Sequence, residues 1–381
     1  MLAYLDNSAT TRPTDGVIDA MSRCMREGYF NPSSLYAPAI DSEKAMRACR
    51  EELASALCVS PKGIFFTSGG TEANNLAIIG TVSAMRGPQH LIVSAVEHPS
   101  VLEAFHYLEG LGHRVTVIGV DGHGQLDWAQ LENALSDPPA LVSCMQVNNE
   151  TGALADIPRL SALVREKAPT ALIHVDGVQG FLRVPFDARL IDLYTMSSHK
   201  IHGPKGVGAL YVRPGVRLIP RQLGGGQEGA LRSGTENTPG IAGFREAARE
   251  MKAMPDRFQH MMEKKKLLWA LFQQAVPAAQ LNGPSIEEGA PHIINISFPG
   301  VRGEVMLHAL EGARVYCSTG SACSSKKRHL SPVLLAMGLD PDRVEAALRF
   351  SLSPLTQDDE IRYAADQLGA IYATLSRFKR R

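Results

Sequence analysis

One lysine stands in a setting that suits covalent chemistry. Lys200 follows the tripeptide S-S-H and precedes the glycine-containing run I-H-G-P-K-G-V-G. Residues 192–196 and 209–212 have strand-forming compositions on either side of it. An amine between two strands, beside hydroxyls and an imidazole, suits a Schiff base to an aldehyde cofactor. The structural alternative is a surface lysine in a hairpin, which a lone lysine would favour.

A second stretch has the pattern of an anion site. Residues 64–67 read as a short strand, S-G-G-T-E follows at 68–72, and residues 73–85 have a helical composition. The first N–H groups of a helix have no internal partners, so such a start can bind a phosphate, and Thr71 adds a hydroxyl. An ordinary βα turn explains the same pattern about equally well.

Strands and helices alternate from there, which predicts an α/β fold with a mainly parallel, doubly wound sheet. Ligands gather at the carboxyl ends of the strands in such sheets. His98, Asn148 and Asp176 each follow a predicted strand, and Gln179 comes three residues after Asp176. We expect a large domain over 13–250. The remainder, 1–12 and 251–381, is expected to form a smaller α+β domain that carries a mobile cysteine loop at about 318–330.

Composition limits the other classes of function. The 381 residues carry a formal net charge of zero, so no overall attraction to nucleic acid is expected. No apolar run reaches the ~18 residues of a membrane helix. The chain shows no export signal at its start, which favours a cytoplasmic protein with reduced thiols. Its six cysteines have no zinc-like spacing, and no metal site is predicted.

Several further motifs surround the lysine. They include Y-L-D-N-S-A-T-T, F-T-S-G-G-T-E-A-N-N, V-E-H-P-S-V, N-N-E-T-G, H-V-D-G-V-Q, L-R-S-G-T-E-N-T and S-T-G-S-A-C-S-S. With S-S-H-K-I-H-G-P-K-G, the set resembles cysteine desulfurases of the NifS/IscS type, which belong to the class V aminotransferases. The resemblance covers nearly the whole chain. It implies a pyridoxal-phosphate-dependent transferase of fold type I, usually a homodimer, that converts L-cysteine to L-alanine and keeps the sulfur as an enzyme persulfide.

The resemblance also implies roles for the cofactor-side residues. Lys200 would hold pyridoxal 5'-phosphate, Asp176 would pair with its pyridine nitrogen, and His98 would stack on its ring and shuttle protons. Gln179 would bind the ring hydroxyl. The residues expected at the phosphate are Thr71, Ser197, His199 and, from the partner subunit, Thr235. As structural alternatives, Asp176 and His98 could each be a helix cap.

On the substrate side, the resemblance implies that Asn148 and Arg349 hold the substrate carboxylate and that Cys323 takes the sulfur. A structural ion pair for Arg349 and inert burial for Cys323 are the alternatives. Cys317 is the most plausible second sulfur acceptor. An iron–sulfur scaffold protein or a tRNA-thiolation enzyme would then receive the sulfur.

The chain departs from the family pattern at named positions. Gly177 stands where alanine is common, and Q-E-G-A-L-R at 227–232 lacks one arginine. These changes concern the rim of the cofactor cleft and the dimer contacts. Two other functions stay open: a related reaction, selenocysteine lysis or transamination, and a cofactor-less sulfur-delivery scaffold. Transamination needs no nucleophilic thiol, whereas the scaffold needs no lysine constellation.

Overall fold

A seven-stranded sheet of order β2-β8-β7-β6-β5-β3-β4 forms the centre of the molecule. The computed structural model describes residues 1–319 and 330–378. Strands β3 to β7 run parallel, whereas β8 is antiparallel to both β7 and β2. The strand bounds are β2 Ile64–Thr67, β3 His90–Ser94, β4 Arg114–Ile118, β5 Leu141–Met145, β6 Leu172–Asp176, β7 Leu193–Ser197 and β8 Gly208–Val212.

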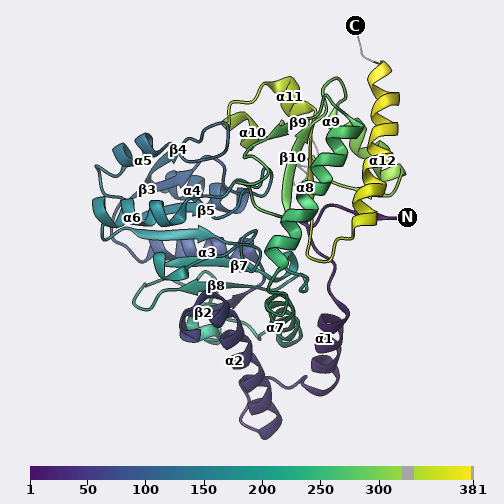
Figure 1. Cartoon of the computed structure of the whole chain (residues 1–381). Helices are drawn as coiled ribbons and strands as arrows, with labels where there is room; N and C mark the ends of the chain where they lie inside the picture. The colour runs from purple at the N-terminus through teal and green to yellow at the C-terminus, as the bar shows by residue number, and fades with distance from the viewer. Residues whose placement is uncertain (320–329, 379–381) are drawn as a thin grey trace.

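Helices cover both faces of this sheet, so β5, β7 and β8 are buried along their whole length and are mostly apolar. One core cluster joins the sheet to α3 and α4, and another joins it to α1, α2, α6 and α7 (Figure 1). The bounds are α1 Asp15–Glu27, α2 Ala37–Leu57, α3 Gly70–Ser83, α4 Pro99–Gly110, α5 Trp128–Ala134, α6 Ile157–Lys167 and α7 Thr238–Lys252.

The C-terminal part surrounds a three-stranded antiparallel sheet of order β12-β10-β9. Its own core includes Ala3 and Leu5, because β1 (Ala3–Tyr4) pairs in parallel with β11 (Val315–Tyr316). Figure 1 accordingly shows the N-terminus beside α12. The other bounds are α8 Arg257–Ala275, β9 Gln280–Asn282, β10 Ile293–Ser297, α9 Gly303–Gly312, α10 Pro332–Ala336, α11 Pro341–Glu345, β12 Ala347–Ser351 and α12 Asp358–Leu375.

Within the described residues, four 3-10 helices lie in connections, η1 Pro61–Gly63, η2 Ala188–Leu190, η3 Ser198–Lys200 and η4 Glu228–Ala230, and η5 Ser376–Phe378 follows α12. The predicted α/β class with a mainly parallel sheet is confirmed. The start of one helix is less accurate: α3 begins at Gly70 rather than 73. Asn237 caps α7 by accepting from the Gly240 N–H.

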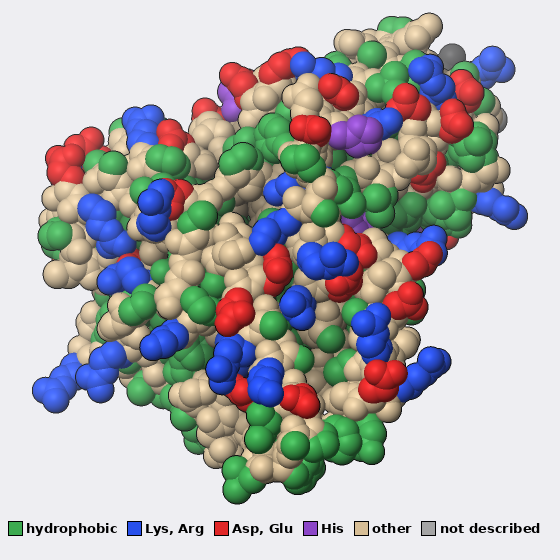
Figure 2. Space-filling view, turned by 60° about the horizontal axis from the view of Figure 1, so that its bottom comes forward, with side chains coloured by type: hydrophobic (Ala, Val, Ile, Leu, Met, Phe, Trp, Pro, Cys, Tyr) green, Lys and Arg blue, Asp and Glu red, His purple; other side chains and the backbone are tan. Residues whose placement is uncertain are grey.

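The outer surface carries mixed charge. Figure 2 shows Lys and Arg side chains interspersed with Asp and Glu on the face that it draws. None of the helices in the described residues is both long enough and apolar enough to cross a bilayer. Across residues 1–319 and 330–378, no group of three or more His, Cys, Asp or Glu side chains is arranged to hold a metal ion.

Candidate active site

Asp176 is a buried carboxylate at the carboxyl end of β6, in register with Met145 on β5 and Thr195 on β7. Its Oδ1 accepts from the Val178 N–H at 2.9 Å. Its Oδ2 accepts from Asn74 Nδ2 at 2.8 Å. Two donors on a side chain that is 4% exposed fix the direction of this carboxylate.

His98 follows β3 and is the N-cap of α4, as its structural alternative proposed. Its Nδ1 accepts from the Ser100 N–H at 3.1 Å and lies 2.8 Å from Ser100 Oγ. Burial lowers the pKa of His98, the negative charge of Asp176 opposes that shift, and the positive charge of Lys200 adds to it. Asp176 and Lys200 therefore both act on the His98 imidazole, which is neutral near pH 7.

Lys200 ends η3, directly after β7, so it lies between the antiparallel strands β7 and β8 as predicted. The half-buried amine donates to the carbonyl oxygens of Ser8 at 2.5 Å and Ala9 at 2.8 Å. Gln179 Nε2 donates to the same Ser8 oxygen at 2.9 Å. The N-terminal segment thus covers both side chains, and a cofactor on Lys200 requires its amine to leave these carbonyls.

The residues expected at the phosphate flank the start of α3. Thr71 is exposed in the first turn, and Ser197 is buried at the end of β7. A Cβ on Gly208 would lie only 2.7 Å from Gly69 Cα, so the strand β8 and the S-G-G turn need glycine for this close approach. The turn therefore lies against the start of β8, where Gly208 pairs with Ser197 of β7.

His199 lies in η3, with its Nδ1 at 3.1 Å from Thr10 Oγ1. Burial, with added repulsion from Lys200, Lys205 and Arg183, lowers the pKa of His199 to about 3. Its imidazole is therefore a neutral hydrogen-bonding group rather than a cation. Thr235 is exposed to solvent in this single chain.

A cavity of about 520 Å³ opens beside His98. The side chains of Thr71, Asn75, Ser100, Tyr107 and Arg221 are among those that line it. The cavity therefore connects the first turn of α3 with the face of α4 that begins at the histidine.

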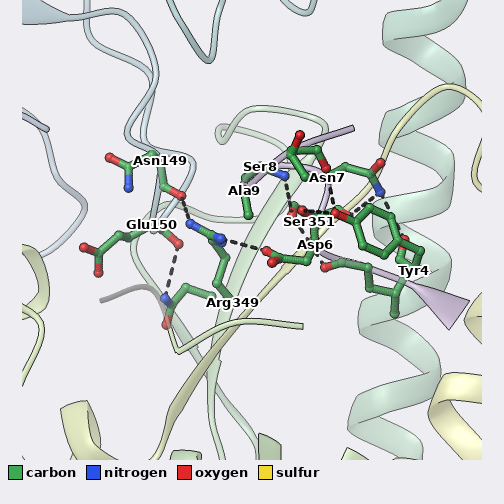
Figure 3. A network of polar contacts seen from close by, with 12 residues as sticks. Tyr4, Asp6, Asn7, Ser8, Ala9, Asn149, Glu150, Arg349 and Ser351 are labelled. Atoms are coloured by element: carbon green, nitrogen blue, oxygen red, sulfur yellow. Dashed lines mark hydrogen bonds and ion pairs between the residues drawn. The ribbon is translucent and has the colours of Figure 1, made fainter. Parts of the chain in front are cut away.

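Arg349 lies in β12, where it bridges the N-terminal segment and the segment that follows β5 (Figure 3). Its Nη2 is 2.7 Å from Asp6 Oδ1, and its Nη1 donates to the Asn149 oxygen at 3.0 Å. Its Nε is buried without a partner within the described part of the chain. The ion pair that the sequence left open for Arg349 is thus present.

Asn148 uses both ends of its amide locally. Its Oδ1 accepts from the N–H groups of Glu150 and Thr151, both at 2.9 Å, and its Nδ2 donates to the Val96 oxygen at 3.0 Å. The structure brings the chain around Asn148 to Arg349, but the side chain of Asn148 is occupied in shaping the turn.

Of the two cysteines that were predicted to take up sulfur, the structure describes only Cys317. Cys323 lies outside the described residues, as does most of the loop predicted at 318–330. Burial raises the pKa of the Cys317 thiol, and the Asp6 charge adds to the shift. Ser318 exchanges backbone hydrogen bonds with Arg349, at 2.6 and 3.1 Å, so the predicted loop begins beside the arginine.

Sequence reasoning missed several residues of this site. Asn74, Ser100, Asp6 and Ser8 each lie inside a motif quoted above, but nothing in the motif says which partner they contact. Glu97 was also missed: it is buried, and its Oε1 accepts from the Met145 N–H at 2.6 Å. Burial and the neighbouring Asp176 charge raise the pKa of Glu97 well above its usual range.

The packing around position 177 explains why glycine stands there in place of alanine. A Cβ there would lie 2.0 Å from Tyr194 Cζ and 2.3 Å from its hydroxyl oxygen. Tyr194 is fully buried, and it donates to Gln146 Oε1 at 2.6 Å. The tyrosine ring thus fills the space that an alanine methyl group at 177 would need.

The geometry agrees with what the whole chain is similar to. Residues 3–363 match the family model described as Aminotransferase class-V. The chain belongs to the class-V aminotransferase family. The family and fold predicted from the sequence are therefore both confirmed.

Individual members of the class-V aminotransferase family show which of its proteins this chain resembles. A protein named Cysteine desulfurase from Trichormus azollae is 40% identical over 364 residues, which cover 94% of this chain and 90% of that protein. One named Cysteine desulfurase IscS from Clostridium botulinum (strain Hall) is 38% identical over 97% of this chain and 94% of its own. A solved structure described as a NifS-like protein superposes with a TM-score of 0.92 at 34% identity, covering 98% of this chain and 100% of the other.

Proposed function

We infer that this protein is a cysteine desulfurase, which converts L-cysteine to L-alanine and retains the sulfur as a persulfide. The observation that carries this inference is the placement of Asp176 at the end of β6 and of Lys200 directly after β7, where both act on His98 at the start of α4. It stands in a chain that is about 40% identical to proteins named cysteine desulfurases. Selenocysteine lysis is the nearest competing reaction, and the same product assay with L-selenocysteine separates the two.

The residues fit pyridoxal 5'-phosphate, the cofactor that the class-V aminotransferase family implies. We propose that Lys200 holds it covalently, that Asp176 faces its pyridine nitrogen, and that Gln179 binds its ring hydroxyl. An ionised, directed carboxylate is the right partner for a protonated pyridine, and the first turn of α3 supplies phosphate-binding N–H groups. The proposed phosphate side chains are Thr71, Ser197 and His199. When bound, this cofactor supplies an electron sink for carbanion chemistry.

The remaining side chains handle protons and position the substrate. His98, neutral and beside both charges, holds or moves a proton at Nε2, because its Nδ1 is used as an acceptor. Arg349 is proposed to bind the substrate carboxylate with Asn148 nearby. Its guanidinium now contacts Asp6, so substrate binding exchanges one carboxylate for another.

We propose that Cys323 is the sulfur acceptor. The carbon–sulfur bond of L-cysteine breaks, a sulfur–sulfur bond forms to Cys323, and carbon receives a proton in place of sulfur. One substrate thiol and one enzyme thiol therefore give alanine and one persulfide, with no outside oxidant. Cys323 is five residues beyond Ser318, which pairs with Arg349, so a fully extended chain lets it reach at most about 17 Å from that point.

The organisation of the chain supports further proposals. Separate cores over 17–251 and over 3–5 with 262–368 agree with a large domain at 13–250 and a small domain at 1–12 and 251–381. A homodimer would cover Leu35, which is 96% exposed, with its exposed neighbours Tyr29 and Tyr36. Thr235 would then reach the partner subunit's phosphate site. An iron–sulfur scaffold or a tRNA-thiolation enzyme, in a cytoplasm, is the proposed sulfur destination.

Replacing Cys323 with Ser tests the function. The variant should keep the visible absorption of the lysine-bound cofactor but lose persulfide formation and catalytic alanine release. Cys58→Ser is the matched control, because Cys58 is an exposed cysteine at the end of α2. Unchanged alanine turnover in Cys323→Ser would refute the assignment, and a wild-type protein without the cofactor band would revive the scaffold alternative.

A further inference from the structure

A chain of short hydrogen bonds connects Asp176 to His98 through Asn74 and Ser100. Asn74, on α3, donates from Nδ2 to Asp176 Oδ2 at 2.8 Å and to Ser100 Oγ at 2.9 Å. Ser100 Oγ in turn lies 2.8 Å from His98 Nδ1. Asn74 is 1% exposed, so this path is shielded from water at its centre.

The chemistry of the end group fixes the direction of each hydrogen. An ionised Asp176 can only accept, so the Asn74 group that faces it is the NH₂. That same NH₂ donates its second hydrogen to Ser100 Oγ, which leaves the serine hydroxyl hydrogen to point at His98 Nδ1. The Asn74 Oδ1 is buried with no partner in the described residues, so no acceptor interaction holds the amide in the opposite orientation.

His98 consequently receives hydrogens at Nδ1 from two directions. The Ser100 backbone N–H donates to it at 3.1 Å, and the Ser100 hydroxyl is the second donor. A nitrogen that accepts carries no proton of its own. The neutral imidazole therefore carries its single proton on Nε2.

We propose that Asn74 and Ser100 are positioning residues that orient Asp176 and fix His98 as the Nε2–H tautomer, so that proton exchange takes place at Nε2. This proposal rests on the proposed desulfurase function for its catalytic meaning. The hydrogen-bond direction itself is independent of it. These hydrogen bonds also connect Asp176, which would face the cofactor, to His98, which would move protons. A change in the charge of either residue therefore affects the other.

The test observes His98 directly. In ¹⁵N-histidine-labelled, cofactor-loaded protein, the ring nitrogen shifts identify the tautomer, and a pH titration gives the midpoint for His98. The charged groups that act on its ring or line its cavity are Asp176, Lys200, Glu103 and Arg221. Wild type should show a protonated Nε2 and an unprotonated Nδ1.

Ser100→Ala should raise the midpoint, because a donor that stabilises the neutral ring is lost. It should also lower kcat about tenfold with little change in KM, as expected for a weakened proton transfer. Ser100→Thr keeps the hydroxyl and should restore both values. Ser161→Ala removes another buried helical hydroxyl, which donates to the Leu190 oxygen at 2.6 Å, and should leave the His98 signals unchanged.

Asn74→Leu, of similar shape, should shift the His98 midpoint in the same direction as Ser100→Ala. If the Asn74→Leu variant does not fold, the comparison of Ser100→Ala with Ser100→Thr tests the proposal by itself. A wild-type His98 with its proton on Nδ1, or a Ser100→Ala titration that matches wild type, overturns the proposal. If the wild-type protein shows the Nε2–H tautomer but releases no alanine from L-cysteine, the proposed function fails while the hydrogen-bond relay stands.

Discussion

Two polar clusters in this molecule hold their charges in different ways. At the end of β6, Asp176 accepts hydrogen bonds from one neutral amide and one backbone N–H. At β12, Arg349 is paired with a full opposite charge, Asp6, which comes from the N-terminal segment. The first cluster leaves its charge available to a ligand, whereas the second has its charge already matched.

This difference indicates how each of the two clusters would bind a ligand. A carboxylate oriented by neutral donors is organised before a cationic ring arrives, and it gives up no ion pair on binding. An arginine with an internal carboxylate must exchange partners when a substrate carboxylate binds. Under the proposed function, the cofactor side would thus be set in advance, whereas substrate would bind by replacing Asp6 at Arg349.

The largest effect should come from removing the charge on the prearranged side. Asp176→Asn keeps an acceptor for Val178 and so should fold, but alanine formation should fall by at least on the order of a hundredfold, the size of losing one preorganised electrostatic partner. Circular dichroism checks the fold. Asp137→Asn, an exposed aspartate paired with Arg114, is the control. Near-normal turnover in Asp176→Asn would show that this carboxylate does not face the cofactor.

On the exchanging side, two variants should move KM in different directions. Arg349→Lys loses the planar fork, and KM for L-cysteine should rise roughly tenfold to a hundredfold with a smaller change in kcat. Asp6→Asn removes the competing carboxylate, so KM should fall or stay level. Steady-state kinetics on both variants measures this. A KM that rises in Asp6→Asn would mean that Asp6 orients the arginine instead of competing with substrate.

Gly177→Ala probes the packing behind the prearranged side. The added methyl group would overlap the Tyr194 ring, so the free energy of unfolding should fall by about 1–3 kcal/mol. Urea denaturation measures the loss. Gly110→Ala, at the end of α4 where a Cβ meets nothing within 4 Å, is the matched control and should change little. Equal stability of the two variants would contradict the fit of Gly177 to Tyr194.

The smallest effect concerns Glu97, and it appears only in the pH dependence of stability. Its folded pKa is raised, so the folded protein holds a proton that the unfolded chain releases above about pH 4.3. This contribution is complete below the unfolded pKa and is lost as pH rises through the folded value. Glu97→Gln should remove that downward slope, measured as urea midpoints from pH 5 to 8. An identical slope in the variant would show that Glu97 is ionised in the folded protein.

The residues at the strand ends were predictable because parallel strands present their carboxyl ends at one edge. His98, Asn148 and Asp176 all follow such strands. The Asp6–Arg349 pair was not predictable from spacing, because its members lie 343 positions apart. Gly177 and Tyr194 are closer in sequence, but only the folded structure shows that the Tyr194 ring fills the space next to Gly177. Local sequence patterns thus predict which residues lie at the ends of strands. Which residue each of them contacts is known only from the folded structure.

The position of the first strand has a consequence for how the protein is made. Residues 3–7 contact Val315–Tyr316, Arg349 and Ser351, and Lys200 donates to the carbonyl oxygens of residues 8 and 9. A ribosome delivers the two ends of this arrangement at the beginning and near the end of synthesis. A nascent chain that stops before β11 therefore carries Lys200 but lacks both Arg349 and the strand that pairs with β1.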